Sequence, residues 1–292
     1  MSWIAYQRAY PSAQGHSVVG NVRVKRNVGG GTVAARDIIV YLPPSYTKIK
    51  TAHFPVLYMH DGQNCFDRKT SYSGEWAADE AAERLAKRGL ECIIVAVPNA
   101  GVARIDEYGP WFEAKIKLPG MAGGAGGRAN EYLEYLTNIV KPLVDSSFRT
   151  LTDAKHTGVA GSSMGGIMSL YALLEAPDIF GFAGCFSSAF WVGRSGLLKY
   201  VQTHIAANAR IYLDCGHREG GQSRESSLYL EDNRKIAGML VSQGTYDLVF
   251  LEDETGIHSE TEWRKRFPAM LEWFLNPRRK PKTDMWLKKE SI

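Results

Sequence analysis

The chain has 292 residues, of which 45% are hydrophobic and 23% are charged, and its formal net charge is +4 at pH 7. These values are typical of globular proteins and exclude a disordered or fibrous chain. The dense basic stretch 278–282, together with Lys288 and Lys289, lies near the C-terminus, where we expect a solvated tail. A nucleic-acid-binding protein would mix basic and aromatic residues over one face, so we expect no nucleic-acid partner.

The N-terminal residues and the cysteines bear on the cellular compartment. The opening MSWIAYQRAYPSAQG lacks the basic and apolar regions of a secretion signal, and no stretch approaches 18 apolar residues, so we expect no membrane association and a cytoplasmic protein. Cys65, Cys92, Cys185 and Cys215 are far apart in the sequence, which favours buried thiols over disulfides or a metal site. The oligomeric state is open, and a homodimer is compatible with the sequence.

The first two predicted strands, 21–26 and 36–42, flank a glycine cluster at 28–31. Glycine clusters suit hairpin turns, so this opening is expected to be antiparallel. Two prolines after residue 42 end the second strand.

Further along the chain, short apolar runs alternate with segments whose apolar residues recur at helical spacing. This alternation predicts an α/β fold, with a mostly parallel central sheet, helices on both faces and ligands at the C-terminal ends of the strands. No internal repeat is visible, so we expect one domain over 1–292. The predicted strands are 54–60, 92–97, 157–160, 182–186, 210–215 and 247–251, and the predicted helices are 76–85, 131–144, 164–176, 195–204, 226–241 and 260–274.

The clearest functional signal is the segment 161–166, which joins a predicted strand to a predicted helix. Gly161, Ser163 and Gly165 fit the pattern G-x-S-x-G, in which small residues let the backbone turn sharply and expose the serine hydroxyl. Ser162 fits less well, because a methionine stands two residues after it. A helix that starts behind the serine directs free N–H groups at an oxyanion, as acyl transfer requires. The alternative is a glycine-rich turn that only packs closely.

Residues 99–130 form an insertion without clear periodicity, and they include the glycine-rich run 119–127. Long irregular insertions are often functional loops or lids, although an ordinary surface loop is the alternative. Because the insertion follows a strand of the parallel sheet, we expect it at the same sheet edge as Ser163, near the active site. The helix 131–144 contains Pro142, which should kink it or mark its last turn.

Four sequence blocks together resemble one family. They are HDGQN at 60–64, GSSMGG at 161–166, DCGHRE at 214–219 and GIH at 256–258, the last followed by Trp263. In this order they resemble the "putative esterase" family of α/β hydrolases, which includes feruloyl esterases, enterochelin-type siderophore esterases and mycolyltransferases. The resemblance spans most of the chain from the third strand onward. It is weaker over the first 50 residues and the insertion, where we expect substrate choice to be made.

The resemblance implies a catalytic triad in the order nucleophile, acid, histidine. Ser163 is then the nucleophile. His258 is the expected base, because it follows the last strand on a loop that opens a helix, where this fold places the base. Glu219 is the expected acid, because in related esterases the acid lies a few residues past a similar Cys-Gly turn.

Other assignments remain open at this point. His217 competes as the base because it also lies beyond a strand end, although it occupies the place of the acid. Asp214 competes as the acid, followed by Glu252 and Asp253. A metal site within 215–219 is conceivable, but alternate residues at a strand end rarely converge on a metal and the sequence suggests no fourth ligand.

In this fold the oxyanion hole combines the N–H after the nucleophile with one from the loop after the third strand. These would be the main-chain N–H groups of Met164 and Gln63. Aromatic residues that flank the insertion or follow the sixth strand are candidate walls of the substrate pocket, although core packing explains them equally well. These candidates are Tyr108, Trp111, Phe190 and Trp191.

The sequence therefore predicts a serine carboxylic-ester hydrolase that forms an acyl-enzyme on a small-molecule ester and needs no metal or organic cofactor. An acyltransferase would use the same residues and differ only in the acceptor. Feruloyl or acetyl groups on sugars, siderophore lactones, short acyl esters and thioesters are all compatible substrates. A non-catalytic binding protein on this scaffold would be expected to have lost a triad residue.

Overall fold

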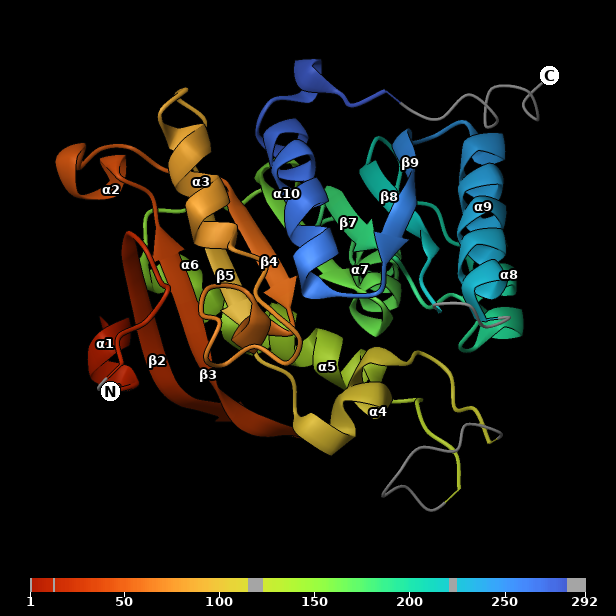
Figure 1. Cartoon of the computed structure of the whole chain (residues 1–292), viewed down its shortest axis with the longest axis horizontal. Coiled ribbons are helices and arrows are strands. Elements are labelled where there is room, and N and C mark those ends of the chain that lie inside the picture. Colours follow the sequence, from red (N-terminus) through yellow and green to blue (C-terminus); the bar gives the residue numbers. More distant parts are fainter. Residues whose placement is uncertain (1, 13, 115–122, 221–224, 283–292) are drawn as a thin grey trace.

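The structure is a computed structural model that describes residues 2–12, 14–114, 123–220 and 225–282. In this part of the chain nine strands form one sheet (Figure 1). They are β1 (Ile4–Ala5), β2 (Asn21–Gly30), β3 (Val33–Leu42), β4 (Val56–His60), β5 (Ile93–Val97), β6 (Thr157–Ser162), β7 (Phe182–Phe186), β8 (Arg210–Arg218) and β9 (Asp247–Ile257).

The spatial order of the strands is β1-β2-β3-β5-β4-β6-β7-β8-β9. The strands β1, β2, β3 and β5 pair antiparallel, and all pairs from β5 through β4 to β9 are parallel. The predicted fold class, a mostly parallel sheet with antiparallel N-terminal strands, is therefore confirmed.

Helices cover both faces of the sheet, because alternate side chains of the buried strands point to opposite sides. Leu57 and Met59 of β4 pack with α3 and α10 on one face, whereas Val56 and Tyr58 pack with α5 to α9 on the other (Figure 1). The helices are α1 (Tyr6–Ala9), α2 (Ser45–Lys48), α3 (Ala78–Ala86), α4 (Arg104–Tyr108), α5 (Ala129–Tyr135), α6 (Lys141–Ser147), α7 (Met164–Glu175), α8 (Arg194–Thr203), α9 (Glu225–Gln243) and α10 (Glu260–Leu275). Among the described residues, none of these helices is long and apolar enough to cross a membrane.

The N-terminal hairpin turns later than the sequence predicted. Instead of turning at 28–31, β2 continues to Gly30 and the chain turns at Gly31 and Thr32. The pairing shifts register twice between Lys25 and Gly30, which absorbs the irregular glycine segment within the strand. Val28 is buried in the core, so its packing keeps this part of the strand paired.

The insertion is more regular than predicted, and the helix that follows it is less regular. The segment 99–130 contains the short helix α4, which is too short to produce a detectable period in the sequence. Part of its glycine-rich run, 119–122, lies outside the described residues. The predicted helix 131–144 consists of α5, a π-helical turn at Leu136–Val140 and α6. Pro142 lies just after that turn, which accommodates its missing N–H.

Strands β8 and β9 extend past their predicted ends at 215 and 251. They remain paired as far as Arg218 and Ile257. Glu219 and His258 directly follow these two residues, so the longer pairing brings two predicted site residues to the same edge of the sheet.

Candidate active site

Ser163 lies at a sharp turn between β6 and α7. Its φ of 58° and ψ of −120° fall in a region that residues other than glycine rarely adopt, and such strain is typical of functional turns. Glycines on both sides allow close packing, because a Cβ added at Gly161 would lie 3.0 Å from the Gly165 carbonyl and one added at Gly165 would lie 3.3 Å from Cβ of His60. The Ser163 N–H donates to the Phe186 carbonyl at 2.9 Å, which ties the turn to β7.

Ser163 opens onto a cavity of about 730 Å³ at the C-terminal ends of the strands. His258 lines the same cavity, as do Asn99, Gly101 and Arg104 from the start of the insertion. This part of the insertion therefore lies beside Ser163. The other lining residues are Asp61, Gln63, Asn64, Thr70, Ser71, Tyr72, Ser73, Ser162, Glu260 and Trp263.

His258 is held by a carboxylate and two aromatic rings. Its Nδ1 lies 2.8 Å from Oε2 of Glu219, whose side chain is fully buried. Because the carboxylate only accepts hydrogen bonds, it keeps the hydrogen on Nδ1 and leaves the Nε2 lone pair free to take a proton. The rings of Tyr229 and Trp263 each lie 4.9 Å from the imidazole, measured between ring centroids. The imidazole orientation is thus fixed by three neighbours.

The alternative histidines have other partners. His217 Nε2 lies 2.7 Å from Oε2 of Glu252, which also binds Arg234. His60 is buried beneath the turn at Ser163, where its Nδ1 lies 3.0 Å from the Tyr132 hydroxyl. Burial lowers the pKa of His60 to about 4, so this ring is neutral near pH 7.

The alternative acid, Asp214, is paired with an arginine. Both of its oxygens accept from Arg266, at 3.0 Å from Nε and 3.1 Å from Nη2. The Tyr212 hydroxyl donates to the same carboxylate at 3.1 Å. Asp214 is fully buried, and burial raises its pKa even though Arg266 opposes that shift.

The main-chain N–H groups of Gln63 and Met164 lie in the first turns of two helical segments. Gln63 lies in a 3-10 turn at Gly62–Asn64, and Met164 is the first residue of α7. The N–H groups in a first helical turn have no acceptor within their own helix, so they are available to an oxyanion.

The loop that carries Gln63 is held by a partly buried ion pair. Arg104 Nε and Nη2 each donate to an oxygen of Asp61 at 2.7 Å, and Asn99 Nδ2 donates to Asp61 Oδ1 at 2.6 Å. Burial alone would raise the pKa of Asp61, but the Arg104 guanidinium outweighs it and holds this pKa below its usual range. Asp61 itself adopts a left-handed conformation with a φ of 53°. These contacts fix the shape of the loop beside the nucleophile.

The comparison that decides the family is a match over most of the chain. Residues 32–274 match the family model described as "Putative esterase". The chain belongs to this esterase family. It is therefore a carboxylic ester hydrolase, as the four sequence blocks predicted.

The chain is also similar in sequence to a curated relative and in fold to solved structures. The uncharacterized protein YbbA of Bacillus subtilis is 27% identical over 247 residues, which cover 84% of this esterase and 94% of YbbA. The fold is similar to that of an IroE-like serine hydrolase from Shewanella oneidensis, with a TM-score of 0.72, 18% identity and coverage of 87% of this chain and 80% of that one. It is also similar to a ferulic acid esterase, with a TM-score of 0.63, 18% identity and coverage of 87% and 98%.

The four aromatic residues suggested as pocket walls are not among the residues that line the cavity of this esterase in the described part of the chain. Tyr108 and Phe190 are buried in the core, and the Tyr108 hydroxyl accepts the N–H of Asp61. Trp111 packs edge-on against Tyr200, with ring centroids 5.6 Å apart. Trp191 is 40% exposed. Tyr108, Phe190 and Trp111 thus pack within or against the core.

Tyr229 on α9 belongs to the site, although the sequence analysis did not identify it. Besides its contact with His258, its side chain interacts with those of Ser163 and Trp191. Burial raises its pKa above the ordinary value, so the phenol stays protonated at working pH. No local motif marks this tyrosine, because it lies within an ordinary amphipathic helix.

Proposed function

We propose that this carboxylic ester hydrolase acts through a triad of Ser163, His258 and Glu219. The observation that best supports the proposal is the 2.8 Å contact between His258 Nδ1 and Glu219 Oε2, made by a histidine that lines the same cavity as Ser163. The strained turn at Ser163 adds support, because it exposes the hydroxyl at the start of a helix.

The proposed reaction has two halves. In the first, His258 Nε2 takes the proton of Ser163 Oγ while that oxygen attacks the ester carbonyl carbon. The N–H groups of Gln63 and Met164 stabilise the oxyanion of the tetrahedral intermediate. His258 then gives the proton to the leaving alcohol as the ester C–O bond breaks, which leaves an acyl group on Ser163.

In the second half, water attacks the acyl-enzyme and His258 accepts a proton from it. Collapse of the second tetrahedral intermediate returns that proton to Ser163 and releases a carboxylic acid. Throughout, the Glu219 carboxylate stabilises the imidazolium form of His258. Every step uses side chains and main-chain groups of the protein.

The cavity supports a small-molecule ester with polar groups near the scissile bond. Its wall carries the side chains of Gln63, Thr70, Ser73 and Asn99, which can hydrogen-bond a hydroxylated alcohol or acyl part. Tyr72 lies at the same wall with 92% of its surface exposed, so it offers a flat apolar face. We propose that the whole chain acts as one domain, because the strands that carry these residues belong to one sheet.

Replacement of Ser163 tests the proposal. Since triad residues act as a unit, Ser163→Ala should lower kcat by about 10⁴ to 10⁶ fold on an ester that the wild-type protein hydrolyses. A panel of p-nitrophenyl, acetyl-sugar, feruloyl and siderophore esters identifies that substrate, and product analysis with an added alcohol distinguishes hydrolysis from acyl transfer. Circular dichroism checks that the variant is folded.

The matched control is Ser162→Ala, which removes a hydroxyl from the neighbouring residue at the same cavity. We expect this variant to keep most of its activity. An active Ser163→Ala together with an inactive Ser162→Ala would disprove the proposed nucleophile.

A further inference from the structure

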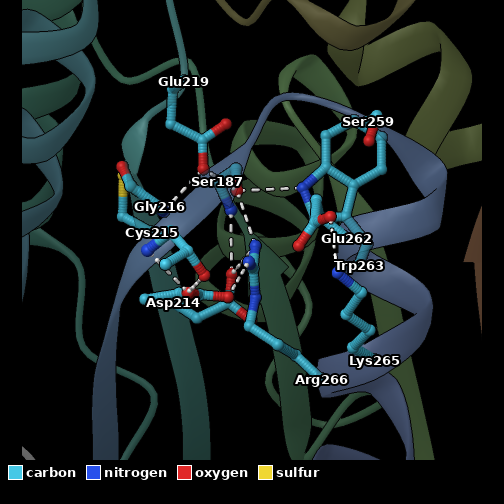
Figure 2. A network of polar contacts seen from close by, with 12 residues as sticks. Ser187, Asp214, Cys215, Gly216, Glu219, Ser259, Glu262, Trp263, Lys265 and Arg266 are labelled. Carbon is cyan, nitrogen blue, oxygen red and sulfur yellow. Dashed lines mark hydrogen bonds and ion pairs between the residues drawn. The ribbon is translucent and has the colours of Figure 1, made fainter.

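A buried network contacts Oε1 of Glu219 (Figure 2), whereas His258 contacts Oε2 of the same carboxylate. Its central residue is Ser187, which directly follows β7 and is fully buried. Ser187 Oγ lies 2.5 Å from Glu219 Oε1, 2.9 Å from Trp263 Nε1 and 2.9 Å from Arg266 Nη2. One hydroxyl therefore joins three groups from distant parts of the sequence.

The chemistry of these partners fixes the direction of the Ser187 hydroxyl hydrogen. An indole N–H and a guanidinium can only donate hydrogen bonds, so Trp263 and Arg266 occupy the two acceptor positions of Ser187 Oγ. The hydroxyl hydrogen is left to the third partner, a carboxylate oxygen of Glu219, which can only accept. Ser187 must therefore donate to Glu219.

The residues that surround Ser187 are themselves held in place. Arg266 makes two bonds to Asp214 and a third, from Nη1 to Asp253 Oδ2, at 3.2 Å. Although burial lowers the pKa of Arg266, the Asp214 carboxylate outweighs burial and raises it, so the guanidinium stays charged. The Ser187 N–H donates to the Asp214 carbonyl at 2.9 Å. Ser187 is held with a φ of 42°, a costly conformation for a non-glycine residue.

We propose that Ser187 is a positioning residue, which Arg266 and Trp263 orient so that it fixes the Glu219 carboxylate against His258 and sets the pH range in which His258 accepts a proton. This inference rests on the triad proposed above. Ser187 is absent from the described lining of the cavity, so its proposed role is exerted through Glu219 rather than by contact with substrate.

The charge on Glu219 is stabilised by two hydrogen bonds to Oε1, from Ser187 and from the Gly216 N–H at 2.6 Å. Loss of the Ser187 donor concentrates negative charge on the carboxylate, which then holds the imidazolium form of His258 more strongly. The protein consequently needs a higher pH to release that proton and become active. Among the residues that the structure describes, the other titratable or charged groups that act on Glu219 include Asp214, Cys215, Tyr229 and Arg266.

The test compares Ser187→Ala with wild-type protein in p-nitrophenyl acetate hydrolysis over a range of pH. Loss of one hydrogen bond to a charged group should lower kcat by about tenfold to a hundredfold and move the acid limb of the kcat/KM profile up by about half a pH unit or more. KM should stay the same, because Ser187 does not touch the substrate. Ser187→Cys keeps a weak donor in place and should give intermediate values.

Ser188→Ala is the matched control. It removes the next hydroxyl along the chain, which is also buried and, among the described residues, has no hydrogen-bond partner. We expect this control to keep the wild-type pH profile. If Ser187→Ala does not fold, Ser187→Gly replaces it, because glycine adopts a positive φ without strain.

The inference would be overturned if Ser187→Ala kept the wild-type pH profile. This holds whether its kcat is unchanged or falls only as far as that of Ser188→Ala. The proposed triad would still stand after that result, provided that Ser163→Ala is inactive. Full activity of Ser163→Ala would instead refute the proposed function itself.

Discussion

Glu219 and Asp214 are both buried carboxylates, one directly after β8 and one within it, and their partners distinguish them. Glu219 faces the Nδ1 of His258, whereas Asp214 faces Arg266. Glu219→Gln should therefore leave His258 in the wrong tautomer and lower kcat by about 10⁴ fold with little change in KM. Steady-state kinetics on the substrate found in the ester panel checks this.

Asp214→Asn is the comparison variant. It breaks a buried ion pair, so it should lower the free energy of unfolding by about 3 kcal/mol, measured by urea denaturation, while kcat falls far less than in Glu219→Gln. The assignment of the acid is wrong if Asp214→Asn is inactive while Glu219→Gln hydrolyses esters normally.

Sequence reasoning identified residues with a local motif and missed those whose partners are distant. The turn at Ser163 is readable from its glycines together with the predicted strand before it and the predicted helix after it. Ser187 carries no such motif, because its role depends on Arg266, which lies 79 residues away in the sequence. The pair Ser187 and Ser188 after the buried strand β7 was a usable signal, because polar residues at that edge of a parallel sheet often belong to the functional site.

At the scale of elements, periodicity located the strands but not their ends. The apolar runs of β8 and β9 stop at polar residues such as His217 and Glu252, although backbone pairing continues to Arg218 and Ile257. Backbone hydrogen bonds do not require apolar side chains, so the continuation was invisible in the sequence pattern. The same limit explains why Tyr108 was a candidate pocket wall although it lies in the core, since an aromatic residue near a site and one in the core look alike in a sequence.

The start of the insertion and the loop after β4 act as one unit, joined by Arg104 and Asp61. Arg104→Ala should release the loop that carries Gln63 and lower kcat by up to about 10² fold, since removal of one oxyanion donor costs 10² to 10³ fold. Arg104→Lys should recover only part of this, because an ammonium cannot replace a two-bond guanidinium contact. A loss confined to KM would show that Arg104 instead binds substrate.

At the scale of the whole molecule, His60 links stability to pH. Its pKa is lowered from 6.5 to about 4 in the folded state, so between these values the unfolded chain binds a proton that the folded protein does not. The free energy of unfolding should therefore fall as the pH drops from 6.5 to 4, and His60 should contribute about 3 kcal/mol to this decrease.

His60→Gln isolates this contribution, because glutamine stays neutral and can accept from the Tyr132 hydroxyl. Urea unfolding at pH 7 and pH 4 should show a smaller loss of stability on acidification for this variant than for the wild-type protein. The exposed His53→Gln serves as the control and should behave like wild type. Equal losses in wild type and His60→Gln would mean that His60 is not held neutral by burial.

Covalent labelling tests whether Ser163 is the nucleophile of an acyl-transfer site. The folded protein is treated with a fluorophosphonate, digested, and mapped by mass spectrometry. We predict a single phosphonyl adduct on Ser163, which is absent in Ser163→Ala and forms much more slowly in His258→Ala, because an unactivated serine is a poor nucleophile. An adduct on Ser162, or wild-type protein that stays unlabelled while it hydrolyses esters, would contradict the account.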